Sequence, residues 1–511
     1  MSPFVFALAL GAASESHASD LTPYLAPERS LLEHARAVSL DLRGTVLTPA
    51  EVEAVLEAGE LDDATLSAWL ASEAFADQVV RHHRTLFLNS IDLYGERLRY
   101  LRAYYSAGDY VYYTYYRQHQ LRDGGVCTNY DADVNALNQP QSWITHSDGS
   151  IDEGAVDVVP WWDPSITLRV CARDAQLTEI SSSGNDCRTL EGDSDTECGC
   201  GPNLEWCNFE WRSGHEDFNR SMSEAISRRV WDVVHEDRAY TTLLTTSSVY
   251  VNGVLVDYYK NRVGYSTVFE LPVPVDQLPD IPREDADTWV ELPAADHYAG
   301  ALTEPGWLLR YSTNRGRANR FFTEFLCGEF LPPEGGIMEV AEENPTPDLS
   351  QKPVCMDCHT VLEPWAAYWG RWRESGTVYY PESEYPTYSE ECAACAPNCR
   401  GVAGCSDYMT DPEHPHEEPY VGVFAPYVFL YGDAEEHPTL GPALWAETIA
   451  DDGRLARCSA EKAAIWLLGK TEREISPALI DGWADEFTAS GLSYQALVRA
   501  IVTSPAYGRA R

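Results

Sequence analysis

Fourteen cysteines in 511 residues constrain the fold of this chain more than any other feature of its sequence. A cytosolic enzyme uses so many thiols for metal sites, whereas an exported chain oxidises them to disulfides. The N-terminus favours export, because an apolar run from Phe4 to Ala13 precedes Ser16 and Ala18, small residues at the spacing of a signal-peptidase site. No Lys or Arg precedes the run, which is atypical. We therefore predict a signal peptide over residues 1–18, a periplasmic or secreted location, and many disulfides.

The acidic surplus limits the partners of the chain. There are 80 acidic and 37 basic residues, and the formal net charge is −43. Such a surface repels phosphate backbones and anionic lipid, so we predict no nucleic-acid partner. No later stretch reaches the ~20 apolar residues that a bilayer requires, so we also predict no membrane span. The charge is compatible with simple solubility or with the steering of a basic partner.

One short segment combines two cysteines with a histidine. Residues 354–360 read Val-Cys-Met-Asp-Cys-His-Thr and contain the pattern C-x-x-C-H. Thiols three residues apart can add to the two vinyl groups of one haem, and the adjacent His then directs its imidazole at the iron. An exported chain reaches the compartment in which such attachment takes place. We therefore predict one covalent haem c, bound through Cys355, Cys358 and His359.

Zinc is the alternative ligand of these thiols. Cys355 and Cys358 form one C-x-x-C pair, and Cys392 and Cys395 form a second, as a four-thiolate zinc site requires. The long gap between the pairs and the oxidising compartment favour haem instead. A thioredoxin-like use of either pair is disfavoured, because no βαβ pattern surrounds it.

A purely electron-transferring haem iron needs a sixth ligand. Met409 is the leading candidate, because it follows His359 by fifty residues and lies in a polar loop where a lone Met is unusual. His414, His416 and His437 are alternatives, and an open five-coordinate iron is another. We expect the second ring nitrogen of His359 to donate to a backbone carbonyl near Pro364.

The remaining twelve cysteines are predicted to be mostly oxidised. Six of them lie in a loop-rich segment over residues 117–215, where disulfides replace an extensive core. Cys392, Cys395, Cys399 and Cys405 are close in sequence, so we expect them to pair among themselves. The Tyr-rich segment 91–115 favours a half-buried hairpin or helix, and the alternative is an aromatic platform for carbohydrate.

Apolar periodicity and capping residues predict a mainly α, multi-domain protein. Thr48-Pro49-Ala50-Glu51 forms a capping box, and further helices are expected after Ser72, from Phe218 to Asp237, from Asn314 to about Cys327, and from Ser459, Ser476 and Ser493. The predicted division is an N-terminal helical domain (19–116), a Cys-rich insertion (117–215), a helical segment with a Pro-rich linker (216–282), a haem-bearing cytochrome-c-like region (283–440) and a C-terminal helical domain (441–511).

Several short patches resemble the large secreted bacterial cytochrome-c-like proteins, in which domains of unknown function surround a single C-x-x-C-H. The patches are Val38–Thr45 with Thr48–Glu51, Tyr250–Asn252 with Leu255 and Tyr258, Gly300–Leu309 with Arg315–Arg317, Cys458 with Leu468–Gly469, and Val502–Pro505. The family continues its motif as His-x-x-x-Asp-Pro-x-Gly, whereas this chain has Glu363, Pro364 and Ala366 after His359.

The resemblance implies haem binding and a role in electron transfer with a partner oxidoreductase. It does not settle whether the protein is an enzyme, and electron transfer is favoured over catalysis. One alternative is a haem enzyme, of peroxidase or sugar-oxidising type, with an open iron. Another is a carbohydrate-binding or structural surface protein. No Gly-rich nicotinamide or flavin fingerprint and no G-x-S-x-G elbow is present.

Overall fold

The structure is a computed structural model of the full chain, and about half of it is helical. It describes residues 28–509. Within this range it leaves out 90–99, 107–109, 116–126, 128–129, 142, 146, 150, 161–163, 188–194, 196, 207, 210–212, 262–268, 331–348, 352–354, 400–403, 413–414, 416 and 425–436. The predicted signal peptide lies outside the described residues. Among those that are described, no helix is both long and apolar enough to cross a bilayer.

Four short helices open the described chain, and each begins at a polar capping residue. They are α1 (Leu31–Arg43), α2 (Pro49–Ala58), α3 (Asp63–Leu70) and α4 (Glu73–Phe87). The side chain of Thr48 accepts from Glu51 N, and the Glu51 side chain returns to Thr48 N, which confirms the predicted capping box. Ser72 caps α4 as predicted, by accepting from Phe75 N.

The Tyr-rich segment was predicted to form a hairpin or a helix, and it forms a hairpin. Strand β1 (Tyr100–Ser106) pairs antiparallel with β2 (Tyr110–Tyr115), and Tyr104 lies opposite Tyr112. Both strands belong to a five-stranded sheet with strands of the Cys-rich segment, in the order β5-β6-β2-β1-β7. The other strands of this lobe are β3 (Ile144–Thr145), β4 (Ile151–Asp152), β5 (Ala155–Val158), β6 (Leu168–Cys171) and β7 (Asn208–Phe209).

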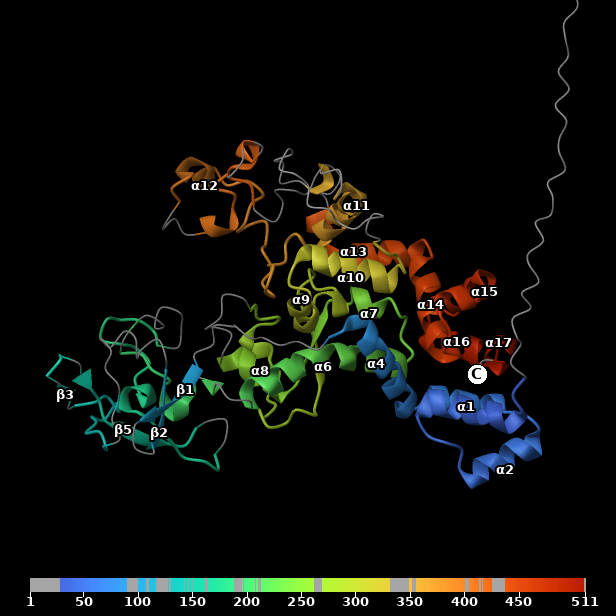
Figure 1. The fold of residues 1–511 in the computed structure, drawn as a ribbon, viewed down its shortest axis with the longest axis horizontal. Helices are drawn as coiled ribbons and strands as arrows, with labels where there is room; N and C mark the ends of the chain where they lie inside the picture. Colours follow the sequence, from blue (N-terminus) through green and yellow to red (C-terminus); the bar gives the residue numbers. More distant parts are fainter. Residues whose placement is uncertain are drawn as a thin grey trace, which may run out of the picture.

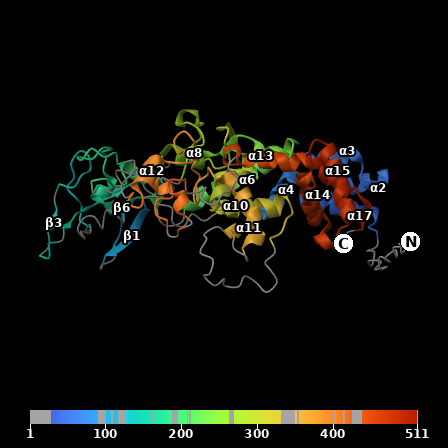
Figure 2. The ribbon, with the colours of Figure 1, turned by 90° about the horizontal axis from the view of Figure 1, so that it is seen from above.

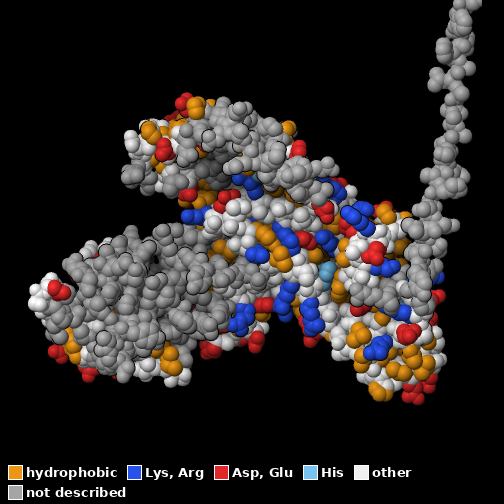
Figure 3. Space-filling model, viewed as in Figure 1, with side chains coloured by type: hydrophobic (Ala, Val, Ile, Leu, Met, Phe, Trp, Pro, Cys, Tyr) orange, Lys and Arg blue, Asp and Glu red, His pale blue; other side chains and the backbone are white. Residues whose placement is uncertain are grey.

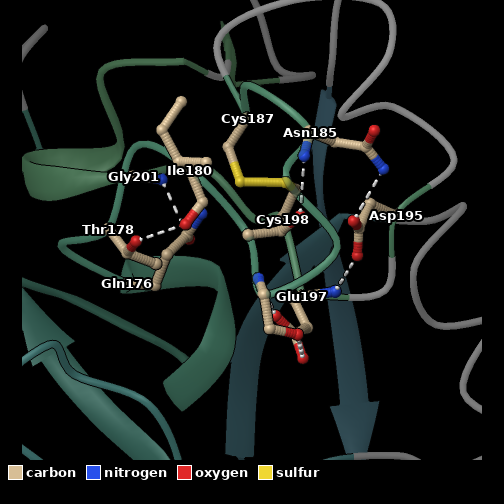
Figure 4. The surroundings of a disulfide bond; sticks show 11 residues. Gln176, Thr178, Ile180, Asn185, Cys187, Asp195, Glu197, Cys198 and Gly201 are labelled. Carbon is tan, nitrogen blue, oxygen red and sulfur yellow. Dashed lines mark hydrogen bonds between the residues drawn. A yellow bond between two sulfur atoms is a disulfide. The ribbon is translucent and has the colours of Figure 1, made fainter.

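Disulfides and polar ties organise the loops of this sheet lobe. Cys127 bonds to Cys171 on β6, and Cys187 bonds to Cys198. Figure 4 shows the second bridge with Asn185 donating to the Asp195 carboxylate at 2.9 Å, while the same carboxylate accepts from Glu197 N. The apolar clusters that the described side chains of the lobe form are small, as expected if cross-links substitute for an extensive core.

The centre of the molecule is built around the long helix α6 (Ser213–His235). Its Met222, Ile226, Val230 and Val234 are fully buried, as the predicted apolar period requires. Around α6 lie α7 (Thr242–Thr245), β8 (Ser248–Val251), α8 (Gly253–Asn261), β9 (Val290–Pro293), α9 (Pro305–Arg310) and α10 (Asn314–Phe325). Strands β8 and β9 pair antiparallel.

The C-terminal half continues with α11 (Met356–Ala366), α12 (Glu390–Cys395), α13 (His437–Asp451), α14 (Arg454–Leu468), α15 (Pro477–Ala489), α16 (Tyr494–Val502) and α17 (Pro505–Gly508). Short 3-10 helices are Ala172–Ala175, Pro202–Leu204, Val275–Gln277, Gly300–Leu302, Leu349–Gln351, Ala367–Trp369, Cys405–Asp407, Glu418–Tyr420 and Glu472–Glu474.

Three local predictions are wrong. Helix α14 begins at Arg454, not at Ser459, which is buried inside the helix. Helix α10 is capped by Thr313, whose side chain accepts from Gly316 N, so Asn314 is its first helical residue. The Pro-rich segment 271–282 is not a free linker, because Val273 and Leu278 are buried in the main core.

One apolar core joins the two ends of the described chain. It contains residues of α1, α3 and α4, of the central helices, and of α13–α17. Figure 1 shows α1 beside α16 and α17, with the sheet lobe at the opposite end of the molecule, and Figure 2 shows the same order from above. The helical domains predicted over 19–116 and 441–511 therefore share one core, although they are far apart in sequence.

Candidate haem site

Cys355 and Cys358 are the free cysteines among the described residues. Ten others form the pairs Cys127–Cys171, Cys187–Cys198, Cys327–Cys458, Cys392–Cys405 and Cys395–Cys399. Cys200 is disulfide-bonded as well, and Cys207 lies outside the described residues. The prediction that most of the twelve other cysteines are oxidised is confirmed for the described ones, and so is the pairing within the group 392–405.

The motif lies at the start of α11. Cys355 is the residue before the helix, and its carbonyl accepts from Cys358 N at 3.2 Å and from His359 N at 3.0 Å. Both thiols and His359 are partly exposed. Residues three and four apart share one face of a helix, so Cys358 and His359 are both neighbours of Cys355. A flat ligand could therefore reach all three side chains from one side.

The imidazole of His359 is held by a carboxylate. Its Nδ1 lies 2.6 Å from Oε1 of Glu363, one helical turn further along α11. The same oxygen accepts from Arg315 Nε of α10 at 2.7 Å, and the Glu363 side chain is only 4% exposed. The expectation that His359 donates to a backbone carbonyl near Pro364 is therefore wrong. Glu363 lies four residues after His359 on the helix, and its side chain is long enough to occupy the Nδ1 position in place of a backbone carbonyl.

This contact selects the tautomer of His359. Nδ1 must carry the proton in order to donate to Glu363, so the lone pair of a neutral ring is on Nε2. Nε2 has no hydrogen-bond partner among the described residues, and it is a common metal-binding atom of imidazole. The ring is thus oriented and is supplied with one free ligand atom.

Aromatic side chains of α10, α11 and α13 pack together near the C-terminal end of α11, and we call this group the aromatic wall. Trp365 of α11 lies 4.5 Å from Phe322 of α10 and 5.0 Å from Trp445 of α13, measured between ring centroids. Phe330 lies 4.7 Å from Phe322. Trp445 is buried, whereas Trp365, Phe322 and Phe330 are partly exposed. An apolar macrocycle beside α11 would meet an apolar wall here.

The core fixes the position of α11. The helix packs on α10, and the Cys327–Cys458 disulfide joins the end of α10 to α14. Directly after α11, the completely buried Trp369 donates from Nε1 to the Leu302 carbonyl at 3.0 Å. The motif therefore lies on an element that is braced on several sides, which favours a defined ligand geometry.

Met409 belongs to a separate small cluster. Its backbone N donates to Val423 O at 2.9 Å and its carbonyl accepts from Gly422 N at 2.8 Å, within the apolar group that includes Tyr408 and Phe424. That group surrounds α12, which lies apart from α11 in both Figure 1 and Figure 2. The role of Met409 as an iron ligand stays a prediction. Of the alternatives, His414 and His416 lie outside the described residues, and His437 is the first residue of α13.

Cys392 is bonded to Cys405 and Cys395 is bonded to Cys399, which removes two thiolates that the four-thiolate zinc alternative requires. The sulfurs of Cys395, Cys399 and Cys405 do lie within 4.8 Å of one another. They are, however, parts of two disulfides, and a disulfide sulfur is not a thiolate ligand. The cluster is therefore explained by its cross-links.

A shallow depression lies between α4 and α6, with a volume of about 370 Å³. Its walls include Arg84, Arg228 and Trp231, and Figure 3 shows basic side chains on this part of the surface. Its charges are largely satisfied internally, because Arg84 pairs with Glu224 at 2.6 Å and Trp231 Nε1 donates to Asp77 at 3.1 Å. Carbohydrate binding stays a prediction. The tyrosines of the alternative carbohydrate platform lie on β1 and β2, whose side chains are outside the described set.

Glu363 and Arg315 were not predicted as site residues. The spacing His359-x-x-x-Glu363 was the available signal, because residues four apart on a helix face each other. Arg315 could not have been found in this way, since its approach depends on the packing of α10 against α11.

Comparisons of this chain with protein-family models, with curated proteins and with solved structures find no match. The resemblance to secreted cytochrome-c-like proteins therefore stays a prediction, and the site is interpreted from its own chemistry.

Proposed function

We propose that this chain is an exported c-type haem protein that transfers electrons. One haem would be bound covalently by Cys355 and Cys358, and Nε2 of His359 would be a ligand of its iron. When bound, the haem supplies a one-electron Fe(III)/Fe(II) couple. The chain's own residues attach the ring, orient the imidazole through Glu363, and shield one side of the site with the aromatic wall.

The observation that carries this proposal is that Cys355 and Cys358 are free thiols, while the other described cysteines form disulfides. Every other described cysteine is bonded, whereas the two thiols beside His359 are free and partly exposed. In an oxidising compartment two free thiols so close in sequence need an explanation. Thioether bonds to a haem supply one, and they leave no reactive thiol in the mature protein.

The test uses the full chain, produced in a periplasm with haem-attachment machinery. The Cys355→Ala/Cys358→Ala variant should lose all haem that survives a denaturing gel, while the wild type retains it. The Cys395→Ser/Cys399→Ser variant is the matched control, because it also removes two nearby cysteines but should keep the haem. Wild-type protein without a Soret band would overturn the proposal, and stoichiometric zinc in that protein would favour the zinc alternative.

A haem enzyme with an open iron is the second candidate, favoured by the location of Met409. Both backbone polar groups of Met409 are engaged with Val423 and Gly422, in the cluster around α12 and away from α11. Carbon monoxide distinguishes the two functions. An unchanged reduced spectrum on adding it indicates a closed iron and electron transfer, whereas a shifted spectrum indicates an open iron and supports the enzyme.

A further inference from the structure

We propose that Glu363 is a positioning residue that acts through His359 to stabilise the oxidised form of the iron. This inference rests on the proposed function, since it concerns the same histidine. It deepens that function by assigning the protein to the low-potential end of its class. Such a carrier would receive electrons from a strong reductant and would pass them readily to an acceptor of higher potential.

The geometry of the contact is fixed by two helices. His359 and Glu363 are four residues apart on α11, and their 2.6 Å separation is that of a short, charge-assisted hydrogen bond. The carboxylate is almost completely buried, so water competes little for the acceptor oxygen. Arg315 of α10 donates to the same oxygen, so Arg315 and His359 compete for the lone pairs of Glu363 Oε1.

The nature of the acceptor determines the basicity of the ligand. A carboxylate draws the Nδ1 proton more strongly than a neutral carbonyl does, and this raises the electron density on Nε2. A more basic ligand stabilises Fe(III) relative to Fe(II), which lowers the reduction potential. Arg315 acts in the opposite direction, because it competes for the oxygen that accepts from His359.

The experiment compares reduction potentials of the haem-loaded full chain. Glu363→Gln removes the negative charge and keeps an oxygen acceptor, and it should shift the ferric–ferrous equilibrium about tenfold toward the ferrous form, or about 59 mV for one electron. Arg315→Met removes the competitor and should shift the equilibrium the opposite way. The control is Glu324→Gln, which alters a partly buried carboxylate of α10 that pairs with Arg320 and Lys462 and should leave the potential unchanged.

The opposite signs distinguish this role from a structural one, since general loosening of the site would move both variants in the same direction. Wild-type haem with equal potentials in all variants would overturn the inference and leave the proposed function intact. If Glu363→Gln does not bind haem, the reduction potential of Arg315→Met tests the inference alone. Absence of haem from the wild type would overturn the proposed function itself.

Discussion

His83 is completely buried on α4 and bonded at both ring nitrogens. Nδ1 lies 2.9 Å from the Val79 carbonyl and Nε2 lies 2.8 Å from the Tyr240 hydroxyl. A carbonyl can only accept, so Nδ1 donates and a neutral Nε2 accepts from Tyr240. Burial lowers the pKa of His83 to about 4. The folded protein therefore requires an uncharged ring at this position.

We predict that acid destabilises the protein through His83. The folded pKa lies below the unfolded value of about 6.5, so this contribution is fully present above pH 6.5 and is lost as the pH falls toward 4. The loss should reach about 3 kcal/mol. Urea unfolding at pH 7, 5.5 and 4 measures it, with His83→Asn as the reference that lacks the group. Parallel pH profiles for the two proteins would contradict the assignment.

At the residue scale, the sequence predicted the three residues of the candidate haem site but not the side chains that surround them. Cys355, Cys358 and His359 follow from a local spacing that needs no knowledge of packing. Arg315, which is 48 residues away from its partner Glu363, needs the contact between α10 and α11. His83 and Tyr240 likewise meet across a sequence separation of 157 residues. Such contacts depend on which helices pack together, and local patterns do not encode that.

The predicted starts of helices are correct where a side chain caps the first turn. Thr48, Ser72 and Ser493 each accept a backbone N–H at the helix that they were expected to open. The prediction fails at α14, because that helix starts after Gly453, which has a left-handed conformation and no capping side chain. Ser459 was a suitable capping residue in type, but it lies in the second turn of a helix that had already begun.

The Cys327–Cys458 disulfide should contribute strongly to stability, because it links α10 to α14 across 131 residues. In the chain-entropy model a long loop loses much more freedom than a short one. Replacing both cysteines by Ser should therefore lower the free energy of unfolding by about 5 kcal/mol. Denaturant unfolding under non-reducing conditions measures the change.

The natural comparison for that variant is Cys395–Cys399, whose separation is only 4 residues. Its replacement by Ser should cost about 3 kcal/mol less than the loss of Cys327–Cys458, because the cost grows with the logarithm of loop length. Equal losses in the two variants would show that the stabilisation does not come from loop closure.

At the scale of the whole molecule, the sheet lobe is separable from the helical core. Its apolar clusters are distinct from the main one, whereas α4 and α6, which precede and follow it in sequence, pack directly on each other. Asn89, just after α4, donates to Ser223 O and Ser227 Oγ of α6. The sequence indicated a Cys-rich insertion, but it placed the hairpin β1–β2 on the wrong side of the boundary at residue 116, because tyrosine content does not reveal strand partners.

We predict that the chain folds without this lobe. Ser223 is ten residues into α6, so the gap back to the helix start is about 15 Å, which a linker of about eight residues spans. Replacing residues 92–211 by Gly and Ser removes all six cysteines of that segment and breaks no disulfide of the remaining chain. Cooperative thermal unfolding and retained covalent haem are the expected results.

The control deletion removes residues 437–511, whose helices supply core residues such as Trp445 and Tyr507. That variant should fail to unfold cooperatively, because it loses part of the shared core. If the variant without the lobe behaves in the same way, the lobe is an obligatory part of the fold and the prediction is wrong.

The junction of α1 with α17 has a consequence for the order of events during biosynthesis. Arg29 N donates to Gly508 O at 3.0 Å, and the fully buried Tyr507 donates to Asp41. A ribosome releases the N-terminus first, so α1 can pack on α2, α3 and α4 early, but its contacts with α17 exist only after that helix has been made. The roughly 150 residues after Cys358 take on the order of 10 to 30 s to synthesise. Throughout that interval the shared core is incomplete, because α10 has not yet gained its contacts with α14.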